Sequence, residues 1–206
     1  MNRLHSTDLI ELARQFFERE RTVNDAAAEF TRDELCSFAR EMSAEMENTV
    51  RDLTPEQIAY RLPGKPAGWD SSGDEAEFDT SEIVTHVAVG VAFYWFGIAR
   101  GLGHGRPQFP RAPRGTNVTG KTGSVLGRGG WSGVPGSELA SLLHDMMHSF
   151  LGYVETLPAE QMETKTVYEG YGELTVNGWL LLLAAHLDLH LKQLKTMQSQ
   201  PDYPYA

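Results

Sequence analysis

The sequence is poor in cysteine, which restricts the kinds of site that it can form. Cys36 is the single cysteine among 206 residues, so an internal disulfide framework and a CxxC metal site are both excluded. Basic residues are also few: 18 lysines and arginines stand against 28 aspartates and glutamates, which gives a net charge of −10. A general nucleic-acid-binding protein is expected to be basic, so we expect no nucleic-acid partner.

Long hydrophobic runs are scarce as well. The longest uninterrupted apolar run, Trp179 to Ala185, is far shorter than the roughly 20 residues that span a bilayer. The opening segment MNRLHSTDLIELARQ lacks the apolar centre of a signal peptide. We therefore expect a cytoplasmic protein without a membrane partner, folded as a single domain over residues 1–206.

Amphipathic helical patterns fill most of the chain, whereas the alternating pattern of strands is nearly absent. We expect a weak helix over 7–20 and long helices over about 31–53, 80–100, 135–157 and 176–198. Thr31 and Glu34 fit a capping box, and segment 163–174 predicts a short hairpin or an extended loop. This order predicts an all-α, antiparallel four-helix bundle, with residues 1–30 as an extension that adds an N-terminal helix.

Residues 101–136 are rich in glycine and proline and contain no acidic residue, which predicts a long basic loop between the second and third helices of the bundle. A loop of this length is usually functional or disordered. Its cations could attract a carboxylate or a phosphate; a solvated loop without a ligand is the alternative. The candidates for such an anion-binding site are Arg106, Arg111, Arg114 and Lys121.

The segment Gly115–Thr122 within this loop matches the phosphate-loop pattern GxxxxGK[ST] letter by letter. That pattern binds phosphate when a strand precedes it and a helix follows it. Here proline-rich residues precede the segment and glycine-rich residues follow it. We therefore predict that the segment does not bind ATP or GTP tightly.

The last predicted helix carries two histidines one turn apart. His186 and His190 share a face with the apolar residues of that helix, whereas its charged residues lie on other faces. Both therefore point into the bundle, where two imidazoles at this spacing can bind one metal ion. A pair of core histidines that hydrogen-bond to other side chains is the alternative. Leu187 replaces the glutamate of an HExxH motif, so a zincin-type general base is missing.

A third histidine favours the metal site. His86 lies on an apolar stripe of the second bundle helix, which also carries Glu82 and two glycines that either open space or allow close packing. One histidine from this helix and two from the last would form a three-histidine site with open positions, the pattern of a catalytic metal site. Glu82 and Gln193 lie on the same faces and are candidates to orient the three ligands.

Two further features are expected to have no role in the metal site. His144 and His148 also have the HxxxH spacing, but they lie about 140° and 180° from the apolar face of their helix. We expect them to face solvent or a partner. Cys36 lies next to the apolar stripe of its helix, where a small buried hydrophobe is favoured over a nucleophile.

Taken with these motifs, the chain resembles the DinB-like superfamily over residues 31–198. The resemblance is carried by a tryptophan in the first long loop (Trp69), the helix-two sequence SEIVTHV and the last-helix sequence GWLLLLAAHLDLHLKQL. It implies a four-helix bundle with a divalent metal ion, nickel or zinc, bound by His86, His186 and His190. The acidic segment after Trp69 is longer than the link that is usual in the family.

Some proteins of that superfamily are metal-dependent S-transferases that use low-molecular-weight thiols. The resemblance therefore implies a thiol-dependent transferase or a related metal-assisted reaction, such as hydrolysis, on a small-molecule substrate. The thiol would be a co-substrate, and its carboxylates are candidate ligands for the basic loop. A non-catalytic metal-binding or stress-response protein is the alternative. A homodimer is compatible with either function.

Overall fold

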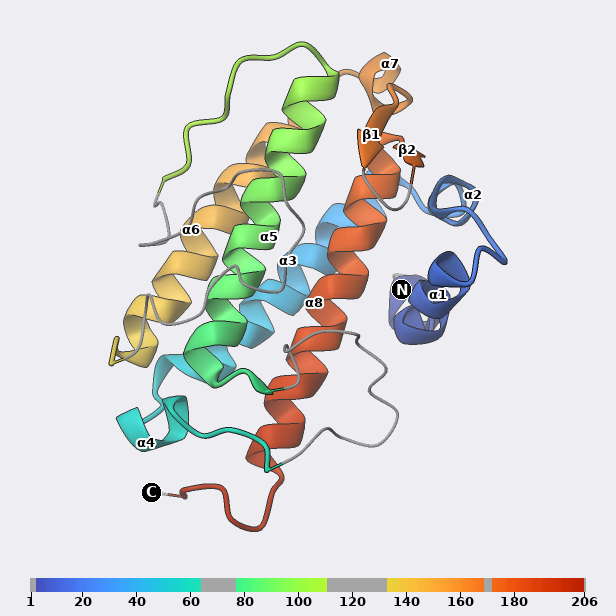
Figure 1. Cartoon of the computed structure of the whole chain (residues 1–206). Coiled ribbons are helices and arrows are strands. Elements are labelled where there is room, and N and C mark those ends of the chain that lie inside the picture. The colour runs from blue at the N-terminus through green and yellow to red at the C-terminus, as the bar shows by residue number, and fades with distance from the viewer. Residues whose placement is uncertain (1–2, 64–76, 111–132, 169–171, 206) are drawn as a thin grey trace.

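The structure is a computed structural model that describes residues 3–63, 77–110, 133–168 and 172–205. Helices make up nearly all of its regular structure (Figure 1). In chain order the elements are η1 (Arg3–Ser6), α1 (Leu9–Phe17), α2 (Val23–Ala27), α3 (Arg32–Arg51), α4 (Pro55–Ile58), α5 (Thr80–Gly101), α6 (Gly136–Glu155), α7 (Ala159–Met162), β1 (Thr166–Tyr168), β2 (Gly172–Leu174) and α8 (Val176–Gln198). The described part of the chain is therefore all-α apart from one two-stranded antiparallel hairpin.

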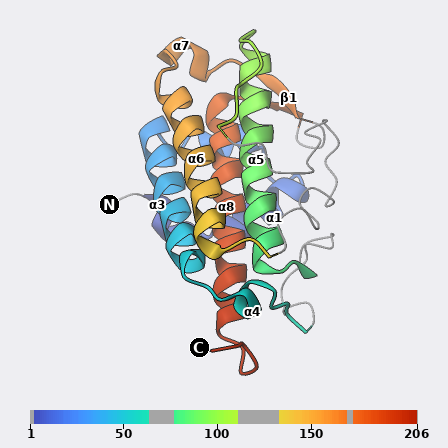
Figure 2. The ribbon, with the colours of Figure 1, turned by 90° about the vertical axis from the view of Figure 1, so that its left-hand side faces the viewer.

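The four long helices α3, α5, α6 and α8 lie side by side and enclose the hydrophobic core (Figures 1 and 2). α3 packs against α6 and α8, and α5 packs against the same two helices. The four are therefore arranged as a square in which α3 and α5 are diagonal. This arrangement puts the inward face of α5 directly against the inward face of α8.

The directions of the four helices differ from the antiparallel arrangement that the sequence predicts. The colour gradient shows that α5 and α6 run the same way, as do α3 and α8 (Figures 1 and 2). The pairs α3–α6 and α5–α8 are antiparallel, but α5–α6 and α3–α8 are parallel, so the prediction is wrong for two of the four packed pairs. The physical reason is that α6 begins at the end of the bundle where α5 also begins, opposite the end at which α5 stops at Gly101.

Side-chain caps fix where the helices begin. Thr31 and Glu34 form the predicted capping box of α3, and Asp79 and Glu82 form another at the start of α5. Thr175 caps α8 by accepting a hydrogen bond from the backbone N–H of Gly178. Each cap satisfies N–H groups that have no partner within the helix, at a gain of about 1 kcal/mol.

The N-terminal segment is attached to the bundle through α8. Both α1 and α2 pack against that helix (Figure 1). Asn24 of α2 bridges to the start of α8, because its Oδ1 accepts from the N–H of Thr175 and its Nδ2 donates to the carbonyl of Glu173. Arg3 reaches α3 and donates two hydrogen bonds to Glu34. The extension therefore supports the helix that carries two of the three candidate ligands.

Helix α5 is the apolar centre of the fold. By length and composition it could cross a membrane, but 72% of its most apolar window is buried inside the protein. Its far end packs closely against the hairpin, since a Cβ atom at Gly101 would overlap the side chain of Thr166 in β1. Burial on most faces explains why α5 is apolar nearly all round.

Candidate metal centre

Three histidines meet between α5 and α8, where His190 is buried and His86 and His186 are half-buried. His86 comes from α5, and His186 and His190 come from successive turns of α8. One ring nitrogen of each can be chosen so that all three atoms lie within 4.8 Å of one another. The other described His, Cys, Asp and Glu side chains form no second cluster of three with this property. The structure therefore brings together the three residues that the sequence singles out.

The three imidazoles face one another edge to face. Their ring centroids are 4.6 to 4.9 Å apart, and the ring planes are inclined by 69° to 79°. The Nε2 atoms of His86 and His186 are 2.9 Å apart. Two neutral imidazoles can share one proton at this distance, and a metal ion bound by both would instead require a lone pair on each nitrogen. Convergent nitrogens of this kind are the donor set of a divalent transition metal.

Two rings of α8 fit against two glycines of α5 with the same spacing. Gly90 lies against the ring of His186, and Gly97 lies against the ring of Trp179. Because both pairs are seven residues apart, the contacts set the register of the two antiparallel helices. The two glycines therefore allow close packing of the helices and do not leave open space. One of them, Gly90, orients a candidate ligand.

His190 is oriented from behind by Gln193. Both side chains are fully buried, and Nδ1 of His190 lies 2.9 Å from Oε1 of Gln193. An amide oxygen only accepts hydrogen bonds, so Nδ1 of His190 carries the proton and its lone pair is on Nε2. A hydrogen bond to the other ring nitrogen is how proteins usually fix a metal-ligating histidine.

Glu82, the other candidate for this role, has different partners. It lies one turn before His86, but its carboxylate accepts from the backbone N–H of Asp79 and forms an ion pair with Arg61 at 2.7 Å. Arg61 also pairs with Asp79 at 2.8 Å. These contacts of Glu82 hold the start of α5, and its link to the histidines is through the helix backbone.

The environment of His186 favours its neutral form. Burial, and then the proximity of His190 and His86, lower the pKa of His186 well below its usual value of 6.5. Its Nδ1 is buried and has no hydrogen-bond partner among the described residues. Neutral imidazole is the form that binds metal, so the site favours the ligand state of His186 at neutral pH.

Aromatic side chains that sequence reasoning did not single out complete the surroundings. The ring of Phe78 lies 5.5 Å from that of His86, and the ring of Tyr94 lies 6.1 Å from that of His186. Tyr94 follows Gly90 by one turn, so the spacing that runs from Glu82 through His86 to Gly90 also leads to Tyr94. Arg61 has no such signal, because its partners Asp79 and Glu82 belong to a later element that only the tertiary fold brings close.

The second HxxxH pair and the cysteine lie where they are expected. His144 and His148 are both exposed on α6 and do not join the cluster. Cys36 is buried in α3, and this burial raises the pKa of its thiol to about 12. A thiol in this environment is a poor nucleophile.

The predicted anion site is described only in part. Arg106 is exposed in the irregular chain after α5. Arg111, Arg114, Lys121, the phosphate-loop look-alike and Trp69 lie outside the described residues.

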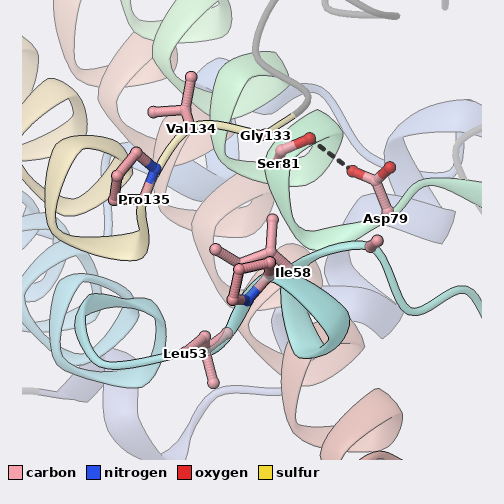
Figure 3. A pocket seen from close by; sticks show the side chains of 9 residues that line it. Leu53, Ile58, Asp79, Ser81, Gly133, Val134 and Pro135 are labelled. Carbon is pink, nitrogen blue, oxygen red and sulfur yellow. Dashed lines mark hydrogen bonds between the residues drawn. The ribbon is translucent and has the colours of Figure 1, made fainter.

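A small pocket of about 170 Å³ lies at the start of α5 and is separate from the histidines. Figure 3 shows its mainly apolar wall, formed by side chains such as Leu53, Ile58 and Val134. At its edge the hydroxyl of Ser81 donates to Asp79 at 2.7 Å. No histidine lines it, so it offers no direct approach to the cluster.

The comparisons with known proteins give one family. A family model described as the DinB superfamily matches residues 74–194, which include all three histidines. The searches of curated proteins and of solved structures found no match.

Proposed function

The chain belongs to the DinB superfamily, and from this premise we propose that it is a metal-dependent enzyme whose centre is formed by His86, His186 and His190. The observation that carries the proposal is the convergence of one nitrogen from each residue within 4.8 Å. Three protein ligands leave coordination positions for other molecules, as in catalytic rather than structural sites. The fold expected for this function is the four-helix bundle of the family.

The residues present suit a divalent ion of the nickel or zinc type. All three donors are imidazoles, which these metals accept readily, and no carboxylate of the kind that calcium or magnesium prefers belongs to the described cluster. Gln193 holds His190 in the tautomer whose Nε2 lone pair is available. Burial keeps His186 unprotonated. These features support a site that is organised before a metal arrives.

Such an ion supplies Lewis acidity, which lowers the pKa of a thiol or of a water molecule. The chain itself fixes the positions around it. Gly90 and Tyr94 bound the ring of His186, and Phe78 covers one side of His86. This aromatic boundary has a low polarity, which strengthens electrostatic interactions within the site.

We assign the reaction to thiol-dependent group transfer on a small molecule, with a low-molecular-weight thiol as co-substrate. The support is the family together with a site of open coordination. The basic residues Arg106, Arg111, Arg114 and Lys121 belong to the chain segment that follows α5. They are the proposed partners for the carboxylates of the thiol.

The decisive experiment is elemental analysis of the purified protein, followed by a thiol-transfer screen of the metal-loaded form. The expected result is about one tightly bound nickel or zinc ion per chain and transfer activity that a chelator abolishes. Metal without transfer to any thiol tested would favour a non-catalytic metal-binding protein. If no tightly bound metal ion is found, the proposal is contradicted.

A further inference from the structure

A second group of histidines lies on the outer surface of α6. His144 and His148 are exposed and one turn apart. Their ring planes are inclined by only 7°, with centroids 5.9 Å apart. Side chains at this helical spacing have Cβ atoms about 5–6 Å apart. Two imidazoles so placed can each turn a nitrogen towards one ion.

His144 is held from behind by a buried acid on the neighbouring helix. Glu47 of α3 is only 8% exposed, and its Oε2 lies 3.2 Å from Nδ1 of His144. Its other oxygen accepts a hydrogen bond of 3.1 Å from the hydroxyl of Ser43. Arg51 is more distant, with its guanidinium 3.9 Å from Oε2. The carboxylate is therefore anchored and directs the Nδ1–H of His144 towards itself.

This hydrogen bond has a consequence for the exposed side of the ring. When Nδ1 carries the proton, Nε2 has the lone pair, and it faces away from Glu47. A carboxylate that orients a histidine in this way is a recurrent support of metal-ligating histidines. The exposed HxxxH pair thus has one oriented ligand and one adjacent, accessible ligand.

We propose that His144 and His148, supported by Glu47, form a second and weaker binding site for a divalent transition-metal ion, distinct from the buried cluster. Two protein ligands leave the ion largely hydrated, so its affinity is lower than that of a three-histidine centre. Imidazole ligands favour nickel, copper or zinc over magnesium or calcium. The site does not depend on the proposed enzymatic function, because it shares no residue with the buried cluster.

The test uses Ni²⁺ alone, added to the full-length His190→Ala protein after treatment with a chelator and followed by calorimetry. Removal of His190 leaves only two histidines in the buried cluster, so the outer site is measured without competition from a three-histidine centre, and the His148→Ala change distinguishes the two remaining histidine pairs. We expect one equivalent of Ni²⁺ to bind with a Kd below about 1 mM. His148→Ala added to this background should weaken binding at least tenfold. Glu47→Gln should weaken it by about tenfold, at the lower end of the effect of removing an orienting partner.

The matched control is His5→Ala, because His5 is also exposed and paired with a carboxylate, Glu41, but has no second histidine one turn away. This change should leave the outer site intact. No measurable Ni²⁺ binding in the His190→Ala protein, or binding that His148→Ala does not weaken, would overturn the proposal. A different outcome is that the wild-type protein binds one equivalent of Ni²⁺, that His148→Ala abolishes this binding and that His190→Ala does not. This outcome would show that the outer site exists and that the buried site does not bind metal.

Discussion

Gly90 of α5 lies directly against the imidazole of His186 on α8. A Cβ atom at position 90 would be 2.8 Å from Cε1 and 3.1 Å from Nδ1 of that ring. The first distance is too short for a carbon–carbon contact, so any larger residue must displace the ring. The orientation of a candidate metal ligand is thus set by a residue with no side chain, on the opposite helix.

The first prediction concerns this contact. Gly90→Ala should reduce metal affinity by at least about tenfold, comparable to loss of an orienting partner, because the ring of His186 has to turn away from the other two histidines. The clash also lowers the stability of the metal-free protein. Alanine offsets part of that loss, because its helix propensity is up to about 1 kcal/mol more favourable than that of glycine. Competition with a chromophoric chelator measures the affinity.

Gly152→Ala is the matched control for this substitution. Gly152 is also a helical glycine, and a Cβ atom there would have nothing within 4 Å. Gly152→Ala should stabilise the protein through the higher helix propensity of alanine, without any change in metal affinity. An equal loss of affinity in the two variants would contradict the role of Gly90.

The second prediction concerns the orientation of His190. Gln193→Ala removes the acceptor of the Nδ1 hydrogen bond in a fully buried position. We expect metal affinity to fall 10- to 100-fold and the free energy of unfolding to fall by about 1–3 kcal/mol. Gln193→Glu keeps an acceptor at the same place and should recover most of the affinity. If the two variants bind metal equally weakly, Gln193 acts through packing rather than through its hydrogen bond.

The third prediction tests which HxxxH pair forms the tight site. His190→Ala should abolish tight binding of nickel or zinc and remove the increase in Tm that the metal gives, since an ion bound only by the folded state stabilises it by mass action. The double change His144→Ala with His148→Ala should leave the tight site and this increase intact. Equilibrium dialysis and thermal denaturation with and without metal measure both. The reverse pattern would refute the assignment of the buried cluster.

Helical periodicity explains why much of the site was predictable. The stripe that places His186 and His190 inward depends only on local geometry, and α8 spans the residues expected for it. The capping box of Thr31 and Glu34 is equally local. Features of this kind can be derived from one segment at a time.

The remaining features depend on tertiary contacts. The parallel direction of α5 and α6 follows from their beginning at the same end of the bundle, which periodicity does not encode. Gln193 and Glu82 look equivalent in the sequence, yet only Gln193 is bonded to a histidine, whereas Arg61 takes up the carboxylate of Glu82. The role of Gly90 requires the register of α5 against α8.

The fourth prediction concerns Gly115–Thr122. The sequence around it lacks the strand and the helix that a phosphate loop needs. We expect ATP and GTP to bind no more tightly than other polyanions, through charge alone. Fluorescence titration with labelled nucleotides measures this. Micromolar affinity that Lys121→Ala abolishes would contradict the prediction.

The fifth prediction is a pH dependence of the metal-free protein. Burial and two neighbouring imidazoles lower the pKa of His186 below its value of about 6.5 in the unfolded chain. Between the two pKa values the unfolded state binds the extra proton, so the free energy of unfolding falls as the pH falls below 6.5. One such group changes it by up to about 1.4 kcal/mol per pH unit.

Urea unfolding of the chelator-treated protein between pH 7.5 and 5 measures this slope. Glu11 and Glu34, whose pKa values are lowered to about 2 by their arginine partners, stabilise the fold above their ordinary value of 4.5 and lose that effect only below it. They therefore do not contribute within this window. His186→Gln cannot take up the proton and should flatten the slope. Equal slopes in the two proteins would show that His186 is not the group that acid titrates on unfolding, and that burial does not hold it in its metal-binding form.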